Sequence, residues 1–197
     1  ELLRGRSLRH AMKHERLSVA SAVGYATQVA QGLAAAHAEG IVHRDIKPDN
    51  LFVRSDGYVK ILDFGLAKLT NERGPIDSVA PTDVVLDTQP GVVMGTPAYM
   101  SPEQARGQEV DARTDVWSLG IVLYELITGR LPFEGGTSSD VIAAILTKEP
   151  PPLERFREDA PAELETVIEK ALAKKRHERY ATAAELAADL KAIVEYA

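Results

Sequence analysis

The sequence of 197 residues contains no cysteine. Disulfide scaffolds, cysteine-bound zinc and thiol nucleophiles are therefore excluded. Cations are not in excess either, because 23 Lys and Arg stand against 29 Asp and Glu and give a net charge of −6. A general affinity for nucleic acid or for anionic membranes needs clustered cations and is not expected here. No apolar run approaches the roughly 18 residues that a membrane-spanning helix requires.

The residues that are present indicate a globular domain. Hydrophobic residues make up 45% of the chain and charged residues 26%, and the length suits one large domain or two small ones, enough to bury a real core. We find no internal repeat and no interdomain linker. The chain opens on Glu1 without a Met or a signal-like segment, so we expect it to be a piece of a longer protein.

Helical patterns dominate the chain. Five segments are predicted to be helical, namely residues 18–37, 115–128, 139–147, 162–174 and 182–196. Ser18 is a typical N-cap, and Gly40 and Gly129 stand where glycine ends a helix. The segment 115–128 is apolar on nearly all sides, which predicts a central, buried helix.

One β-hairpin is predicted, over residues 51–62. Two short β-rich runs flank an Asp-Gly turn signal at residues 55–57. A hairpin returns the chain to its starting point. We therefore expect Asp45 and Asn50, which precede the hairpin, to lie close to Asp63, which follows it.

The loop before this hairpin, His43 to Asn50, reads HRDIKPDN and concentrates charge. Asp45, Asn50 and Asp63 supply carboxylate and amide oxygens. Such oxygens suit Mg²⁺, which usually takes only one or two carboxylates and completes its shell with phosphate and water. Lys47 adds a cation beside any phosphate that the metal holds. Phosphoryl transfer needs this combination of an aligned hydroxyl, a metal and positive charge on the transferred group.

At this point the sequence resembles the protein-kinase superfamily. The motifs that carry the resemblance are HRDIKPDN, Asp63-Phe64-Gly65, Ser101-Pro102-Glu103, the helix motif DVWSLG from Asp115 and, last, Arg179. The family has H-R-D-x-x-x-x-N, D-F-G and A-P-E at the first three of these places. Each match alone would be weak, but their order and spacing agree with the family. Lys47 and the segment GTPAYM at residues 95–100 are serine/threonine-kinase features, and the chain is most similar to bacterial kinases of the eukaryotic type.

The resemblance implies a catalytic set and two cofactors, ATP and Mg²⁺. Asp45 would orient the substrate hydroxyl and accept its proton, and Lys47 would hold the γ-phosphate. Asn50 and Asp63 would hold Mg²⁺. Thr96 would bridge Asp45 and Lys47 and mark the side on which the hydroxyl substrate lies.

The resemblance also implies residues that hold the nucleotide and support the site. Backbone groups of Glu1 and Leu3 would bond the edge of the adenine, and Phe52 would form the floor of the adenine pocket. With Lys47, Asn50 and Asp63, these residues make up the expected nucleotide-binding set.

Further residues have implied structural roles. Asp115 would anchor the backbone of the catalytic loop from below, and His43 would pack beneath that loop. Glu103 and Arg179 would form a buried ion pair, although two separate solvated charges are the alternative.

Arg44, which precedes Asp45, implies regulation. In the family such an arginine pairs with a phosphorylated residue of the activation loop. Residues 68–97 have no helical period and are predicted to form a long loop, which in a compact domain is either functional or disordered. A phosphate adds roughly −1.5 to −2 charge and can order a loop by pairing with Arg. We expect phosphorylation at Thr82 or Thr88, by the same molecule or by a second copy in a kinase dimer.

The resemblance covers only one lobe of a kinase domain. The chain has no G-x-G-x-x-G, and only 17 residues precede Ser18, too few for a small β lobe. The expected fold is therefore mainly α, a large C-terminal kinase lobe with a small inserted β-hairpin and with the N-terminal β lobe missing. This partial kinase domain would span residues 1–197, with the hinge exit at 1–5, the catalytic loop at 43–50, the activation segment at 63–103 and a helical remainder at 104–197.

Two functions remain open. In the first, the chain is the catalytic lobe of a serine/threonine protein kinase that phosphorylates proteins, and it is inactive when isolated. In the second, it is a catalytically dead remnant that binds other proteins. We expect a cytoplasmic location, with any membrane tether in segments outside this chain.

Overall fold

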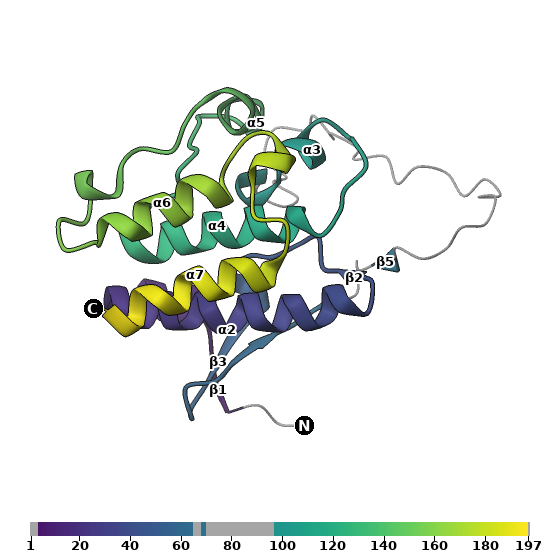
Figure 1. Ribbon diagram of the computed structural model, residues 1–197. Helices are drawn as coiled ribbons and strands as arrows, with labels where there is room; N and C mark the ends of the chain where they lie inside the picture. The colour runs from purple at the N-terminus through teal and green to yellow at the C-terminus, as the bar shows by residue number, and fades with distance from the viewer. Residues whose placement is uncertain (1–3, 65–67, 70–96, 197) are drawn as a thin grey trace.

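The computed structural model describes residues 4–64, 68–69 and 97–196 (Figure 1). The helices are α1 Leu8–His14, α2 Val19–Ala38, α3 Pro102–Ala105, α4 Arg113–Thr128, α5 Ser138–Thr147, α6 Ala162–Ala171 and α7 Ala183–Tyr196. The strands are β1 Gly5–Ser7, β2 Ile41–Val42, β3 Leu51–Arg54, β4 Val59–Ile61 and β5 Lys68–Leu69. The predicted class, mainly α with a small β element, is confirmed.

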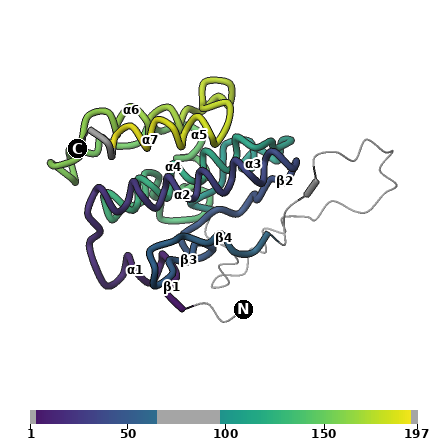
Figure 2. The backbone as a smooth tube through the Cα atoms, turned by 60° about the horizontal axis from the view of Figure 1, so that its bottom comes forward, coloured from purple at the N-terminus to yellow at the C-terminus, as the bar shows by residue number. Residues whose placement is uncertain are grey.

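Helix α4 lies at the centre of the helical layer. Every residue from Thr114 to Ile127 is buried, which agrees with a helix that is apolar on nearly all sides. Helix α2 packs against α4 and α7, and α6 packs against the same two helices (Figure 2). Trp117 of α4 stacks on Phe133, with ring centroids 5.7 Å apart, so the core extends into the segment after α4.

Local capping explains where the helices begin and end. Ser18 accepts a hydrogen bond from a backbone N–H in the first turn of α2, as its N-cap pattern predicted. Gly40, just after α2, and Gly129, just after α4, have φ values of 73° and 72°, in the left-handed region that favours glycine. Helix α6 ends at Ala171, earlier than predicted, because Arg179 binds the backbone carbonyls of the two residues that follow Leu172.

The small sheet has one strand more than the predicted hairpin. Strands β3 and β4 are antiparallel, with Leu51 opposite Ile61, and Gly57 in their turn has a φ of 85°. Strand β1 pairs with the other edge of β3, with Gly5 opposite Arg54 (Figure 1). A three-residue strand is too short to show an alternating pattern, so the sequence did not predict this pairing.

The prediction of a loop over residues 68–97 is wrong for residues 68 and 69. Lys68–Leu69 form β5, which runs antiparallel to β2 with Ile41 opposite Leu69. A strand of two residues is too short to show alternation of apolar and polar residues, so the sequence pattern did not predict β2 or β5. The rest of the predicted loop, up to residue 96, lies outside the described residues.

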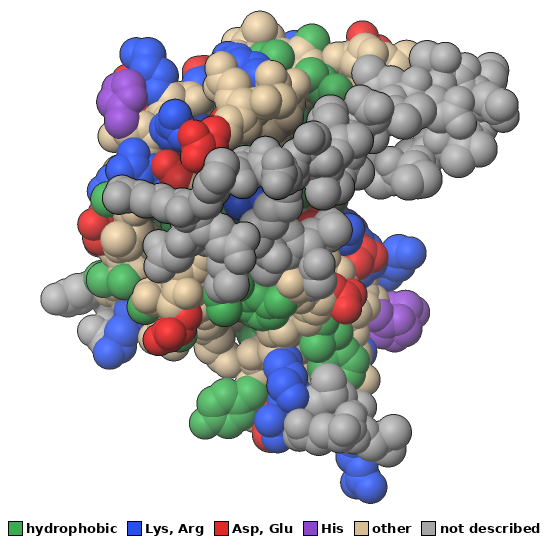
Figure 3. All heavy atoms as spheres, turned by 90° about the vertical axis from the view of Figure 1, so that its right-hand side faces the viewer, with side chains coloured by type: hydrophobic (Ala, Val, Ile, Leu, Met, Phe, Trp, Pro, Cys, Tyr) green, Lys and Arg blue, Asp and Glu red, His purple; other side chains and the backbone are tan. Residues whose placement is uncertain are grey.

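The described part of the surface carries side chains of both charges and few large exposed apolar groups (Figure 3). None of the helices that the structure describes is long and apolar enough to cross a membrane. Acidic and basic side chains are interspersed on the face shown in Figure 3. Within the described ranges, the large hydrophobic side chains that are exposed are Tyr58, at 66%, and Phe64, at 37%.

Candidate active site

Three polar side chains of the loop at residues 43–50 meet at one carboxylate. The Lys47 Nζ atom lies 2.6 Å from Asp45 Oδ2, and Asn50 Nδ2 donates to the same oxygen at 3.0 Å. Asn50 Nδ2 also donates to the Asp45 backbone carbonyl at 2.8 Å. The Asp45 and Lys47 side chains remain 35% and 33% exposed, so the cluster is rigidly bonded yet open to solvent.

The local chain path creates this convergence. Ile46 is fully buried and fixes the middle of the loop in the core. Pro48 then begins a single 3₁₀ turn, in which the backbone N–H of Asn50 donates to the Lys47 carbonyl at 3.0 Å. Proline suits the first position of such a turn because its φ is already fixed and its missing N–H is not needed there. The turn brings Asn50 back over Asp45.

The hairpin of β3 and β4 returns the chain to the loop at Leu62, the residue before Asp63. The N–H of Leu62 donates to the Asn50 carbonyl at 2.8 Å. His43 forms a second connection, because its Nδ1 accepts from the Asp45 N–H at 3.2 Å and its Nε2 lies 2.8 Å from the Leu62 carbonyl. This pair of contacts requires the neutral tautomer with hydrogen on Nε2. His43 is fully buried and orients the loop.

The oxygens left over fit a magnesium ion. Asn50 uses its Nδ2 within the protein, which leaves its Oδ1 as an acceptor. Asp63 is exposed, and its side chain has no hydrogen bond or ion pair to another described residue. The described ranges hold no cluster of three or more His, Cys, Asp and Glu. Mg²⁺ commonly takes one or two protein oxygens beside phosphate and water, so Asn50 and Asp63 could hold it.

Asp115, at the start of α4, supports the loop from inside. It is fully buried, and its two oxygens accept from the backbone N–H groups of His43 and Arg44 at 2.9 and 2.8 Å. His37 Nε2 of α2 lies 2.7 Å from Asp115 Oδ2. Arg44 has a φ of 70°, which is costly for a side chain larger than glycine and persists only where neighbours fix it. Asp115 is one such neighbour.

Gln104 of α3 is a second neighbour, which the sequence reading missed. Its Nε2 donates to the Arg44 carbonyl at 2.9 Å, and its Oε1 accepts from the Ser101 N–H at 3.0 Å. The Ser101 hydroxyl in turn accepts from the Gln104 N–H. The spacing S-x-x-Q is that of a capping box, so the sequence did contain a signal for α3.

Glu103 and Arg179 form a buried, bidentate ion pair. Arg179 Nη1 and Nη2 lie 2.7 and 2.8 Å from the two Glu103 oxygens, and the side chains are 6% exposed for Glu103 and fully buried for Arg179. Burial alone would raise the pKa of Glu103, but the hydrogen bonds and charge of Arg179 outweigh it and hold that pKa below the usual range. Thr114 also donates to Glu103, at 2.9 Å.

The remaining expected site residues are only partly described. Phe52 lies on β3, half-buried and opposite Ser7 of β1. Glu1, Leu3, Thr82, Thr88 and Thr96 lie outside the described residues, so their expected roles stay predictions.

Comparison of this sequence with known protein families and relatives points to one family. The sequence pattern of the protein kinase domain family matches residues 1–190. The chain is 45% identical over 173 residues to serine/threonine-protein kinase Pkn1 of Myxococcus xanthus. The aligned region makes up 85% of this chain and 23% of that protein. The chain is also 40% identical over 201 residues to pkn3 of the same organism, covering 98% of this chain and 35% of the relative.

A third relative is serine/threonine-protein kinase PknB of Mycolicibacterium smegmatis, which is 46% identical over 160 residues, or 81% of this chain and 24% of that protein. The chain thus spans about a quarter to a third of the length of these relatives. Kinases of this family use ATP and Mg²⁺. By its family pattern and its relatives, the chain belongs to the protein kinase family, among the bacterial serine/threonine kinases of the eukaryotic type.

Proposed function

We propose that this chain supplies the catalytic lobe of a Mg²⁺-dependent enzyme that transfers the γ-phosphate of ATP to Ser and Thr hydroxyls of proteins. The observation that carries the proposal is the bonded cluster of Asp45, Lys47 and Asn50. The backbone bond between Leu62 and Asn50 adds Asp63 to it. A carboxylate, a cation and two metal-ligand oxygens are the groups that phosphoryl transfer requires at one point.

Asp45 is proposed to orient the substrate hydroxyl and to take its proton. A carboxylate is a weak base at neutral pH, so positioning is its main task and proton acceptance comes late. The Lys47 ammonium, 2.6 Å from Asp45, would lie beside the transferred phosphate and stabilise its charge. Thr96 would connect the two side chains.

Asn50 and Asp63 are proposed to hold the metal ion. Bound Mg²⁺ would neutralise charge on the phosphates. The residues of this chain do the rest, since the Asn50 amide is already fixed on Asp45 and leaves only its oxygen to the metal.

The nucleotide would lie between this cluster and the start of the chain. Strand β3 directly follows the catalytic loop and pairs with β1, which places Ser7 opposite Phe52. We place the adenine against Phe52, with backbone groups of Glu1 and Leu3 at its edge. This placement of the nucleotide assumes the partial kinase domain that we expect over residues 1–197, with the hinge exit at residues 1–5.

Arg44 is proposed to bind an activating phosphate. Its backbone is fixed by Asp115 and Gln104, while its side-chain Nε is buried without a hydrogen-bond partner among the described residues. A buried, unpaired guanidinium nitrogen is costly and calls for an acceptor. A phosphate on Thr82 or Thr88, added by the same molecule or by a second kinase molecule, would supply one.

The isolated chain is proposed to be inactive, because the glycine loop and the lysine that hold the phosphates belong to the small lobe. We place the enzyme in the cytoplasm, where its ATP is found. The test is transfer of radiolabelled phosphate from ATP to a Ser- and Thr-containing protein. It compares this chain with the same chain fused to a small kinase lobe that carries the glycine loop and the lysine.

Asp45→Asn in the two-lobe protein should reduce transfer by at least about 100-fold, the lower range for a positioned general base. Asp56→Asn is the matched control, because Asp56 is an exposed carboxylate in the β3–β4 turn. Equal transfer by Asp45→Asn and by the wild type would overturn the catalytic assignment. A two-lobe protein that transfers no phosphate but binds proteins would favour the binding-module alternative.

A further inference from the structure

Helix α1 carries two histidines one turn apart on its exposed face. His10 and His14 stand at positions i and i+4, and both side chains are exposed. Leu8 and Ala11 of the same helix are buried and face the core. The N–H of Glu15 bonds to the Ala11 carbonyl at 3.1 Å, so the turn that carries His14 is closed. Because residues four apart are neighbours on one side of a helix, the two imidazoles share a solvent-facing surface.

The rings of His10 and His14 already lie at the spacing that a shared ligand needs. Their centroids are 4.1 Å apart and the ring planes differ by 27°. Two metal–nitrogen bonds of about 2.0–2.1 Å place two ligating nitrogens at most about 4.2 Å apart. A single ion can therefore bridge the two rings after a small rotation of an exposed side chain, without a change in the helix.

The hydrogen bond of the His14 ring leaves its other nitrogen free to bind. His14 Nδ1 lies 2.8 Å from the backbone carbonyl of His10, which can only accept a hydrogen bond. Nδ1 therefore donates, and the neutral imidazole then has its lone pair on Nε2. Histidines that bind metals commonly hold their second ring N–H on such an acceptor, which fixes the tautomer and makes the ligand more basic. The His10 ring stacks on His14 and has no hydrogen bond to another residue that the structure describes.

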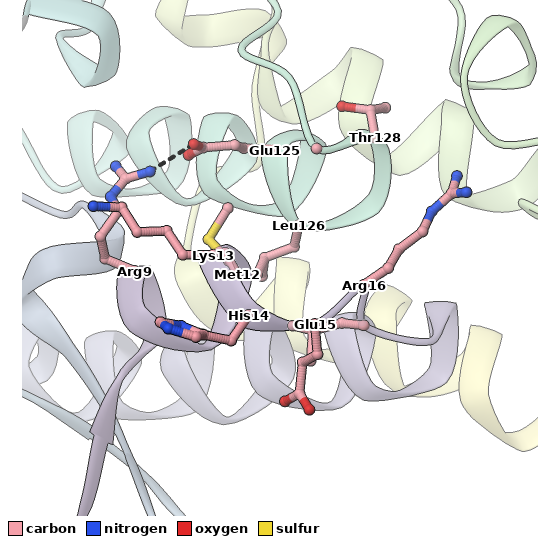
Figure 4. Close-up of a pocket in the computed structure, with 11 residues that line it drawn as sticks. Arg9, Met12, Lys13, His14, Glu15, Arg16, Glu125, Leu126 and Thr128 are labelled. Atoms are coloured by element: carbon pink, nitrogen blue, oxygen red, sulfur yellow. Dashed lines mark hydrogen bonds and ion pairs between the residues drawn. The ribbon is translucent and has the colours of Figure 1, made fainter.

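The positive charges of α1 do not block this pair. The Arg9 guanidinium is held by two carboxylates, because its Nη1 lies 2.7 Å from Glu125 Oε1 and its Nε lies 3.2 Å from Asp49 Oδ2. A hollow of about 510 Å³ opens beside it, between α1 and the end of α4. Figure 4 shows Arg9 extending from α1 toward Glu125, with the His14 ring below it and directed away from Glu125. Lys13 is exposed, and its flexible side chain can turn into solvent.

We propose that His10 and His14 form a binding site for a divalent transition-metal ion of the class of Cu²⁺, Ni²⁺ and Zn²⁺, built from none of the residues of the catalytic loop. Imidazole nitrogens suit these ions, whereas Mg²⁺ prefers oxygen ligands. The described ranges hold no cluster of three or more His, Cys, Asp and Glu, so water would complete the coordination. This inference does not depend on the proposed kinase function.

The residue between the two histidines shows what the site would not do. Zinc peptidases carry H-E-x-x-H on a helix, with the same spacing of two histidines and with the glutamate as general base. Ala11 stands in the place of that glutamate here. The pair therefore has the ligands for binding a metal ion but lacks the base that hydrolysis needs.

The test is a titration of this chain, prepared without a histidine affinity tag, with Cu²⁺ followed by calorimetry. Electron paramagnetic resonance of the Cu²⁺-loaded chain should show one ion coordinated by two imidazole nitrogens. His10→Ala and His14→Ala should each weaken Cu²⁺ binding by at least about tenfold, since even the loss of a residue that only supports a ligand costs 10–100-fold. Ni²⁺ and Zn²⁺ should bind more weakly than Cu²⁺, and an excess of Mg²⁺ should not displace any of the three.

Two variants serve as matched controls. Lys13→Ala changes an exposed residue of the same helix, and His177→Ala removes a histidine that is 72% exposed and lies outside α1. Both should bind Cu²⁺ with the affinity of the wild type. Equal affinity of the wild type, His10→Ala and His14→Ala would overturn the inference. If either histidine variant does not fold, the resonance spectrum of the wild type still decides, because a spectrum with fewer than two imidazole nitrogens also overturns it.

Discussion

Asp115 shows how a single buried carboxylate can hold a catalytic loop in a costly conformation. Its two oxygens accept from adjacent backbone N–H groups, those of His43 and Arg44, and the second of these has a φ of 70°. Asp115→Asn replaces one acceptor oxygen by an NH₂ group, which must then face an N–H donor or turn away. We expect the free energy of unfolding to fall by about 2–3 kcal/mol, the cost of leaving buried donors unpaired.

Urea unfolding of this chain measures the effect. Asp56→Asn is the control, because its carboxylate is 45% exposed and pairs with Arg54, which is 41% exposed, and ion pairs between exposed groups contribute little. If Asp115→Asn unfolds at the wild-type urea concentration, the backbone contacts do not hold the loop.

Sequence patterns named the residues that stand in one short motif and missed contacts between elements that are distant in the sequence. Asp45 and Asn50 stand in one short polar motif. The contact of His37 with Asp115 and that of Arg9 with Glu125 join residues 78 and 116 positions apart. No local pattern encodes such pairs, because they depend on how α1, α2 and α4 pack.

Among the helices, two glycines in helix interiors illustrate opposite packing demands. Gly24 lies in α2, and a Cβ built there would meet no atom within 4 Å. Gly120 lies in α4, and a Cβ there would lie 2.9 Å from Leu172 Cδ2 and 3.0 Å from the Cβ of Ala171. Glycine therefore lets α4 approach α6 closely, whereas in α2 it only weakens the helix.

Gly24→Ala should raise the free energy of unfolding by about 0.5–1 kcal/mol, the gain in helix propensity. Gly120→Ala receives the same gain but overpacks the α4–α6 contact, which costs about 1–3 kcal/mol, so its net effect should be destabilising. Thermal unfolding of both variants compares them. A stabilised Gly120→Ala protein would show that α6 moves away without cost.

Element type was predictable wherever a segment carried a full period. Helix α4 is apolar on nearly all sides and is buried from Thr114 to Ile127, so the sequence pattern and the observed burial agree. Strands β1 and β5 were not predicted, because three and two residues show no alternation and their pairing is decided by the partner strand. Boundaries also shifted where tertiary contacts intervene, as at the end of α6.

The ion pair of Glu103 and Arg179 connects parts of the molecule that are 76 residues apart in the sequence. It connects α3, which holds Gln104 against the catalytic loop, with the segment between α6 and α7. Arg179 also lies over the Trp117 ring of α4 at 4.9 Å. Both charges are buried, so removing one leaves the other unpaired, which costs about 3–5 kcal/mol in such pairs. The pair thus connects the stability of the helical layer to the support of the active site.

The acid stability of the chain should report this pair. The pKa of Glu103 is lowered in the folded protein relative to its ordinary value of 4.5, so its stabilisation is complete above about pH 4.5. It is lost as pH falls below 4.5 and through the lower folded pKa, because protonation then removes the charge that Arg179 binds. Glu103→Gln should therefore lower the free energy of unfolding by about 3 kcal/mol at pH 7, and by progressively less below pH 4.5. Urea unfolding at pH 7, 5, 4 and 3 measures this difference, with Glu39→Gln as an exposed control that should show none. A difference that stays constant from pH 7 to pH 3 would mean that the ionised form of Glu103 does not hold α3 to the rest of the molecule.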